Sequence, residues 1–232
     1  MKTTRLTRRF VVTSLLTLLA PIVLFAPQAY AETYVGGQFG VTFPQSLSNV
    51  HITQDGLGGL SSSDLSLHSS LMGGIKLGHY FTKARWLGIE TELFYTTPHI
   101  KDQSFVVSGP GGSASLGPAS GEYNRVITWA PMNLVLRYDK TRLQPYVAVG
   151  PGVFFAKRTD SNGGTESGTA VGLNSQVGLR YYITRNWTVF GEGKYNLARI
   201  GYTSKDSDPN AALGFRATYS AFILDFGVSY HF

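Results

Sequence analysis

Charged side chains within alternating apolar segments are the first candidates for chemistry in this sequence. Nine of them are the candidates: Lys76, Glu90, Glu92, Arg125, Arg137, Arg180, Glu192, Lys194 and Asp225. Charges of both signs can pair into a salt-bridged plug or line a narrow pore, provided that the fold brings them to one place. The sequence must therefore be searched for the elements that would position them.

Motifs for catalysis or metal binding are weak. The five histidines are His51, His68, His79, His99 and His231. No spacing ties them to a nucleophile and an acid, although Asp102 and Ser104 lie close to His99 in sequence. The absence of cysteine excludes disulfides, thiolate metal sites and a lipid-modified N-terminal cysteine. We expect no enzymatic activity, no catalytic or cofactor-binding residues, no cofactor and no metal.

Eight segments with period-2 alternation are predicted to be β-strands, each long enough to cross a membrane. They cover residues 33–43, 70–82, 86–96, 123–138, 143–157, 169–183, 187–199 and 217–232. Three short polar turns alternate with four long connections rich in Ser, Gly, Asp and Asn. This alternation predicts an all-β, antiparallel up-and-down transmembrane barrel with both termini in the periplasm and long loops outside. Ten strands stay an alternative, because residues 103–107 could add a hairpin.

The alternation also assigns a face to each charge. A lipid-facing Arg or Lys at the membrane midplane costs about 2–4 kcal/mol, so all nine charges are predicted to face the lumen. Antiparallel pairing around the short turns predicts three facing pairs. They are Lys76–Glu92, Arg137–Gln144 and Lys194–Gln176. A one-residue slip would turn each inward residue outward, and we expect Lys76–Glu92 to be the principal pair.

Two other folds fit less well. A soluble barrel of the lipocalin type has an apolar interior, which the inward charges contradict. A β-sandwich would leave the aromatic residues at positions 226, 230 and 232 exposed on a secreted protein.

The first 31 residues predict a cleaved secretory signal peptide. A basic head with Arg8 and Arg9 precedes an apolar run over residues 10–25 and the sequence Ala29-Tyr30-Ala31. Its removal leaves residues 32–232 as one barrel domain, with sixteen cations against fourteen carboxylates and a net charge of +2. The basic balance of the full chain therefore gives no support to nucleic-acid binding.

Several stretches resemble a known family. Residues 222–232 resemble the terminal strand of outer-membrane barrels, and residues 72–81, 130–138 and 144–152 resemble the small OmpA/OmpX-like barrels. The resemblance implies an outer-membrane location in a Gram-negative cell, and a C-terminal assembly signal at Phe226, Val228, Tyr230 and Phe232. It also implies contact with outer-membrane lipid and lipopolysaccharide, and with periplasmic chaperones and the barrel-assembly machinery. We expect a monomer without the peptidoglycan-binding domain of OmpA-type proteins.

Function is less readable than fold. An eight-stranded barrel is just wide enough for side chains to fill, which favours a salt-bridged plug. The leading hypothesis is a structural and surface-interaction role carried by the extracellular loops. A narrow passive porin for small solutes is the alternative. A lipid A hydrolase of the outer leaflet is the third hypothesis, because small barrels of this kind include deacylases that use Ser, His and an acid.

Overall fold

The computed structural model describes residues 32–52, 61–109, 112–119, 123–159, 165–204 and 215–232. The predicted signal peptide, residues 1–31, lies outside the described residues. Among the residues described, no helix is long and apolar enough to cross a membrane.

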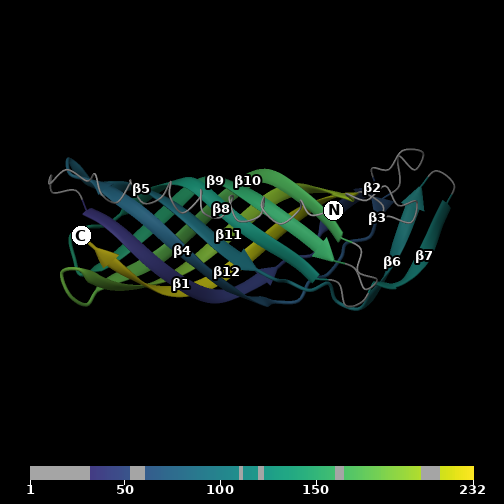
Figure 1. Cartoon of the computed structure of the whole chain (residues 1–232), viewed down its shortest axis with the longest axis horizontal. Coiled ribbons are helices and arrows are strands. Elements are labelled where there is room, and N and C mark those ends of the chain that lie inside the picture. Colours follow the sequence, from purple (N-terminus) through teal and green to yellow (C-terminus); the bar gives the residue numbers. More distant parts are fainter. Residues whose placement is uncertain (1–31, 53–60, 110–111, 120–122, 160–164, 205–214) are drawn as a thin grey trace, which may run out of the picture. The chain divides into compact units, whose positions relative to one another are not determined.

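Eight long strands form a closed barrel (Figure 1). They are β1 (Glu32–Pro44), β4 (Ser70–Phe81), β5 (Ala84–Thr96), β8 (Tyr123–Arg137), β9 (Leu143–Thr159), β10 (Thr165–Tyr182), β11 (Trp187–Ser204) and β12 (Phe215–His231). Each pairs antiparallel with the next, and β1 pairs with β12 over residues 34–44. The predicted up-and-down barrel of eight strands is confirmed, and the alternative of ten strands is wrong.

Four shorter strands lie in the long connections at one end of the barrel. They are β2 (Ser48–Ile52), β3 (Ser61–Ser62), β6 (Gln103–Gly109) and β7 (Gly112–Ala119). They pair in the order β12-β2-β3-β6-β7, so the sheet of the barrel wall continues into the loops. Figure 1 shows the β6–β7 hairpin beyond the end of the barrel that is remote from the C-terminus. We call these four strands the loop sheet.

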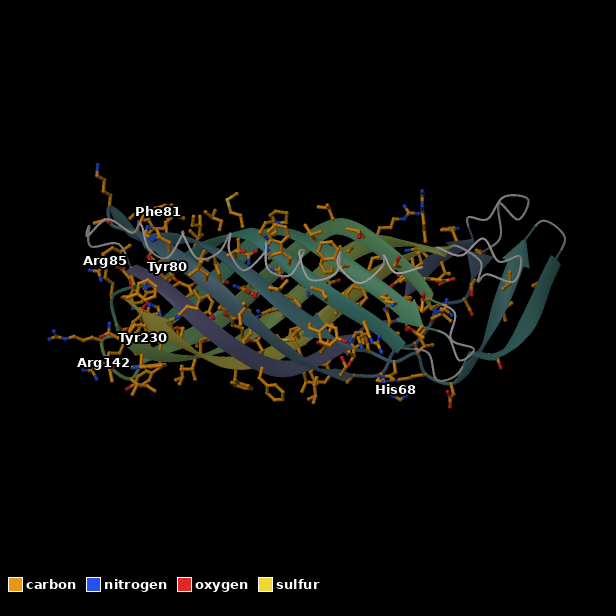
Figure 2. All side chains as sticks on the ribbon, viewed as in Figure 1. His68, Tyr80, Phe81, Arg85, Arg142 and Tyr230 are labelled. Atoms are coloured by element: carbon orange, nitrogen blue, oxygen red, sulfur yellow. The ribbon has the colours of Figure 1, made fainter. Side chains whose placement is uncertain are left out.

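The outer surface of the barrel is apolar. On β12, the side chains of Phe222, Leu224, Phe226 and Val228 are exposed, with Phe226 at 72%. Exposed aromatic residues gather near the short turns, where Figure 2 labels Tyr230 at the end opposite to His68. An apolar band with aromatic residues at its margin is the exterior expected of a barrel in hydrocarbon.

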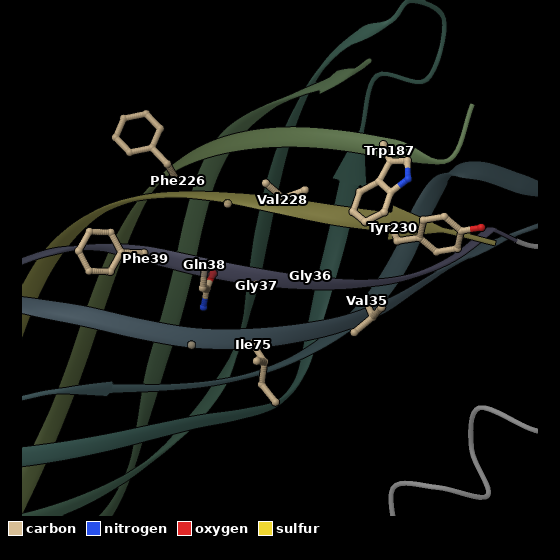
Figure 3. Close-up of a pocket in the computed structure, with 12 residues that line it drawn as sticks. Val35, Gly36, Gly37, Gln38, Phe39, Ile75, Trp187, Phe226, Val228 and Tyr230 are labelled. Atoms are coloured by element: carbon tan, nitrogen blue, oxygen red, sulfur yellow. The ribbon is translucent and has the colours of Figure 1, made fainter. Parts of the chain in front are cut away.

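A shallow groove of about 730 Å³ runs over the seam between β1 and β12 on this outer surface (Figure 3). Its walls are apolar side chains such as Phe39, Ile75 and Phe226, and Trp187 lies at one side. An added Cβ at Gly37 would meet no atom within 4 Å. The groove is therefore an indentation of the lipid-facing surface at Gly37, the position of β1 that has no side chain.

A β-bulge in β8 overturns one predicted face. Glu92 pairs with Ala130 but Glu90 pairs with Asn133, so β8 holds one extra residue between these pairs. A bulge reverses the parity of the inward positions, and it lies beside Pro131, which has no N–H for the ladder. Arg125 is therefore exposed, and the prediction that it faces the lumen is wrong.

The interior has two zones. In the half nearest the loops, side chains from the loop segments pack into the barrel mouth against inward apolar residues of the wall. The loop members are Leu47, Val50, Leu65, Leu67 and Ile100, and the wall members include Val126, Phe154, Ile200, Tyr202 and Tyr219. This mouth cluster seals the loop end with an apolar core. The other zone is polar and holds the candidate site.

Candidate functional site

Six ionisable side chains meet in the middle of the barrel. They are Lys76, Glu90, Glu92, Glu192, Lys194 and Asp225, and the side chain of each is fully buried. All six occupy inward positions, because alternate residues of β4, β5, β11 and β12 point to the axis. The sequence predicted each of these six as a lumen residue.

Two lysines and two glutamates form a closed ring. Lys76 Nζ lies 2.5 Å from Glu192 Oε1 and 3.9 Å from Glu92 Oε2. Lys194 Nζ contacts Glu92 Oε2 and lies 3.1 Å from Glu192 Oε2. Each lysine therefore touches both carboxylates, and each carboxylate touches both lysines. We call this arrangement the ionic ring.

The partners in the ring differ from the expected principal pair. Lys76 does face Glu92 in the ladder between β4 and β5. Its shortest contact, however, is to Glu192, whose strand does not pair with β4. The contact of Lys194 with Glu92 joins β11 to β5, which stand four places apart in the order of eight strands. These contacts cross the lumen rather than follow the wall.

Amides complete the hydrogen bonding of the buried carboxylates and of Lys194. Asn174 Nδ2 donates to Glu92 Oε1 at 2.7 Å, and Gln176 Nε2 donates to Glu90 Oε1 at 2.6 Å. Gln38 Oε1 accepts from Lys194 Nζ at 2.9 Å. Buried charges are tolerated when opposite charges and hydrogen bonds surround them, and the ring meets this condition.

The two carboxylates that flank the ring differ from each other. Glu90 accepts a hydrogen bond from Tyr34 Oη at 2.5 Å and lies 3.4 Å from Lys76 Nζ. Asp225 lies 3.6 Å from Lys194 Nζ, and within the described residues neither of its carboxylate oxygens has a hydrogen-bond partner. Asp225 is thus the least compensated carboxylate of the cluster.

Arg180 lies one layer closer to the short turns, among tyrosines. Its guanidinium carbon is 4.2 Å from the ring centre of Tyr34 and 5.1 Å from that of Tyr146. Its Nη1 donates to Tyr80 Oη at 3.0 Å. A guanidinium over aromatic faces is stabilised without a carboxylate, so Arg180 fills the lumen as a cation in an aromatic cage.

A third cluster closes the end with the short turns. Arg137 Nη1 donates to Glu32 Oε1 at 2.9 Å and to Gln144 Oε1 at 3.2 Å. His231 Nδ1 lies 2.6 Å from the same oxygen of Glu32, which also accepts from Tyr182 Oη. In the ladder between β8 and β9, Arg137 stands opposite Tyr146. The prediction that Arg137 stands opposite Gln144 is therefore wrong by two residues, although the two side chains are hydrogen-bonded.

Several network residues escaped the sequence reasoning. Glu32, Tyr34 and Gln38 share the inward parity of β1, and Tyr146 shares that of β9. The alternation along each strand could have assigned these residues to the lumen. Because they are uncharged or stand at a strand end, the sequence offered no strong reason to do so. Glu32 in particular directly follows the predicted cleavage position, where the strand pattern begins.

The geometry as a whole is that of a plug. Four buried cations meet five carboxylates: Lys76, Arg137, Arg180 and Lys194 against Glu32, Glu90, Glu92, Glu192 and Asp225. Their side chains interlock at three successive levels of one lumen. Such an arrangement fixes the register of the strands and leaves little room for solute.

The predicted assembly signal lies on the outer face of the last strand. Phe226, Val228, Tyr230 and Phe232 are all exposed. Phe232 is held at the seam, since its N–H donates to the carbonyl of Thr33 at 2.9 Å. The terminal pattern thus coincides with the strand that closes the barrel against β1.

Comparison with protein families agrees with this geometry. The family described as the outer membrane protein beta-barrel domain matches residues 16–232. The chain belongs to this outer-membrane β-barrel family. Membership places the protein in the outer membrane as an integral protein. No curated protein matches the sequence closely enough to count as a relative.

Several solved structures of outer-membrane barrels have a fold similar to that of this chain. OprG of Pseudomonas aeruginosa is 16% identical with a TM-score of 0.54, over 87% of this chain and 96% of OprG. Neisserial surface protein A is 15% identical with a TM-score of 0.53, over 86% and 97%. A major outer membrane protein of Thermus thermophilus is 14% identical with a TM-score of 0.55, over 88% and 100%. At these identities the likeness concerns the fold alone.

Proposed function

We propose that this outer-membrane barrel is a surface-interaction protein whose loop sheet contacts partners outside the cell. In this arrangement the short turns and both termini face the periplasm, and the long connections face the exterior. The observation that carries the proposal is the continuity of the sheet from β12 through β2 and β3 to the β6–β7 hairpin. Loops that extend the wall as a sheet can present a defined surface.

The base of the loop sheet is anchored in the barrel. Leu47 and Leu65 exchange backbone hydrogen bonds of 2.8 and 3.0 Å, and both side chains are buried in the mouth cluster. The N–H of His68 donates to the carbonyl of His99 at 2.7 Å, which joins two different connections. An anchored base limits the ordering entropy that a partner would have to overcome on binding.

The outermost strand offers a mode of contact. β7 pairs with β6 on one side and stands last in the order of the described strands. The edge of a strand carries N–H and C=O groups that an extended peptide can pair with. An extended segment of a partner protein is therefore the chemistry that suits this surface best.

A narrow porin receives less support, because the ionic ring and the Arg180 cage fill the lumen at two levels. No specific observation favours a lipid hydrolase. Both alternatives stay open to direct measurement.

Orientation can be tested first, because the chain has no cysteine of its own. We expect a thiol reagent that cannot cross the outer membrane to label Ser108→Cys on intact cells, and to leave Lys140→Cys unlabelled. Both positions are exposed, the first on β6 and the second in a short turn. Labelling with the opposite preference would overturn the orientation.

Binding is then tested with a deletion of residues 103–119 in a strain that otherwise lacks adhesins. We expect binding to immobilised fibronectin, laminin or collagen to fall to background, while a matched deletion of residues 206–213 leaves it unchanged. Heat-modifiable migration in gels verifies that both variants still form barrels. Equal binding by the two deletions, or no binding by the unaltered protein, would contradict the proposal.

A further inference from the structure

Four cations lie on the outer surface at the loop end of the barrel. Arg125 of β8, Lys157 of β9, Arg199 of β11 and Arg216 of β12 are all exposed. Within the part of the chain that the structure describes, none of them has an ion-pair partner at 4.0 Å or less. We call these four residues the cationic belt.

The belt begins where the apolar band ends. Ile127 on β8 and Phe155 on β9 are exposed apolar residues, and the next outward positions toward the loops are Arg125 and Lys157. Two residues of a strand advance by about 7 Å. The first charges thus stand at the level where hydrocarbon gives way to polar head groups.

β11 repeats the same pattern. Leu197 is its last exposed apolar side chain, and Arg199 follows at the next outward position. On β12, Arg216 pairs with His51 of β2, and both side chains are exposed. The repetition on separate strands makes the belt a feature of the barrel rather than of a single loop.

The centre of the belt is a pair of like charges. Arg125 and Lys157 are direct ladder partners of β8 and β9, and both point outward. Side chains directly opposite on neighbouring strands have Cβ atoms about 4.5–5.5 Å apart, and like charges in this position destabilise the sheet. An anion between the two cations would relieve the repulsion.

Among the described residues, the belt covers the half of the barrel wall that runs from β8 to β12. At the loop ends of β1 and β4 the corresponding outward side chains are Phe43 and Leu71, which are uncharged and exposed. From β8 to β12 the strand spacing gives a breadth of about 19 Å. Because β8 and β12 stand four places apart in the order of eight strands, their outward side chains lie on opposite walls, and the ladder neighbours Arg125 and Lys157 are the two belt residues placed to share one head group.

We propose that Arg125 and Lys157 form a phosphate-binding site for the lipid A head group of lipopolysaccharide. The phosphates of lipid A lie at the boundary between acyl chains and sugars in the outer leaflet. Arginine binds phosphate through two parallel hydrogen bonds, and lysine adds a compact charge. The inference rests on the proposed orientation, in which the loop end faces the exterior.

The test uses the full-length barrel purified in detergent. We expect native mass spectrometry to show binding of bisphosphorylated lipid A, and the variant Arg125→Gln/Lys157→Gln to bind about 25-fold more weakly, from about a factor of five for each charge. The matched control Lys83→Gln/Arg185→Gln removes two exposed charges from the short turns and should bind as the unaltered protein does. Lipid A without phosphates should bind weakly to all three proteins.

Three results would overturn the site. They are equal affinity of the belt variant and the control, equal binding of lipid A with and without phosphates, and displacement by millimolar inorganic phosphate alone. The failure of the loop-sheet proposal is distinguishable, because the deletion of residues 103–119 leaves the belt in place. Thiol labelling that places the loop end in the periplasm would instead reject the inference together with the orientation.

Discussion

Lys76 Nζ lies 2.5 Å from Glu192 Oε1, although 116 positions separate the two residues in the chain and their strands do not pair. Closure of the barrel by β1 and β12 brings them together. The contact braces the lumen from wall to wall, which hydrogen bonds between neighbouring strands cannot do. The following predictions test this bracing and the closure that creates it.

Removal of a ring cation should destabilise the barrel strongly. Lys194→Met leaves Glu92 and Glu192 with Lys76 as their remaining ring cation, and leaves Asp225 without its nearby charge. Breaking a buried pair in this way costs about 3–5 kcal/mol. Urea unfolding in lipid vesicles, followed by tryptophan fluorescence, measures the loss.

Asp225→Asn is the matched control for this substitution. It removes the carboxylate that has no hydrogen-bond partner among the described residues and keeps the side-chain shape. We expect the free energy of unfolding to stay within about 1 kcal/mol of the unaltered value. Equal losses for Lys194→Met and Asp225→Asn would refute the ring as the main support of the lumen.

Glu32 should fasten the first strand to three others. It contacts Arg137 of β8, Tyr182 of β10 and His231 of β12. Glu32→Gln should lower the free energy of unfolding by about 1–2 kcal/mol, since hydrogen bonds to a charged group are lost at a partly exposed site. Asp139→Asn, whose contacts to the exposed Arg85 and Lys140 are 3.9 and 3.8 Å long, should change it by less than about 0.5 kcal/mol.

The mass of the exported protein gives a second check on Glu32. We expect cleavage after Ala31, so that Glu32 is the first residue of the mature chain. A mature chain that begins after Glu32 would exclude this residue from the cluster at the short-turn end.

Gly40 should be indispensable at the seam. It pairs with Asp225, and an added Cβ would lie 2.1 Å from the Leu224 carbonyl oxygen and 2.6 Å from the Asp225 Cα. Gly40→Ala should therefore force β1 and β12 apart and cost about 1–3 kcal/mol. Gly37→Ala on the same strand meets open space and should fold as the unaltered protein does, as judged by heat-modifiable migration. Similar yields of folded barrel from both variants would show that the seam is not tightly closed.

The unaltered protein should not conduct ions. The ionic ring fills the lumen at one level and the Arg180 cage at the next, so planar bilayers should show no steady openings above background. A wide general porin inserted in parallel verifies that the bilayers report conductance. Reproducible single-channel steps from this barrel would favour the porin hypothesis instead.

Much of the fold could be predicted from sequence because period-2 alternation and turn length are local properties. The strand over residues 143–157 was predicted to within two residues of β9, and Lys76 was placed opposite Glu92 correctly. Both predictions need only the alternation of residues along a strand and the length of one turn.

The errors arise where remote segments decide the structure. The extra residue in β8 near Pro131 becomes visible only against its neighbour β5, so Arg125 was given the wrong face. The contact of Lys76 with Glu192 depends on barrel closure, which no local pattern encodes. The loop sheet likewise requires β3 and β6 to meet from different connections.

The ionic ring also limits the order in which the barrel can assemble. The β4–β5 hairpin holds Lys76, Glu90 and Glu92, one positive charge against two negative ones, whereas Lys194 is supplied by β11 more than a hundred residues later. A nascent barrel without its last two strands would lack both the contact of Lys76 with Glu192 and that of Lys194 with Glu92, in a lumen still open to water. Insertion of the complete chain is therefore the step at which the interior can become dry, so partial barrels should be discarded rather than matured.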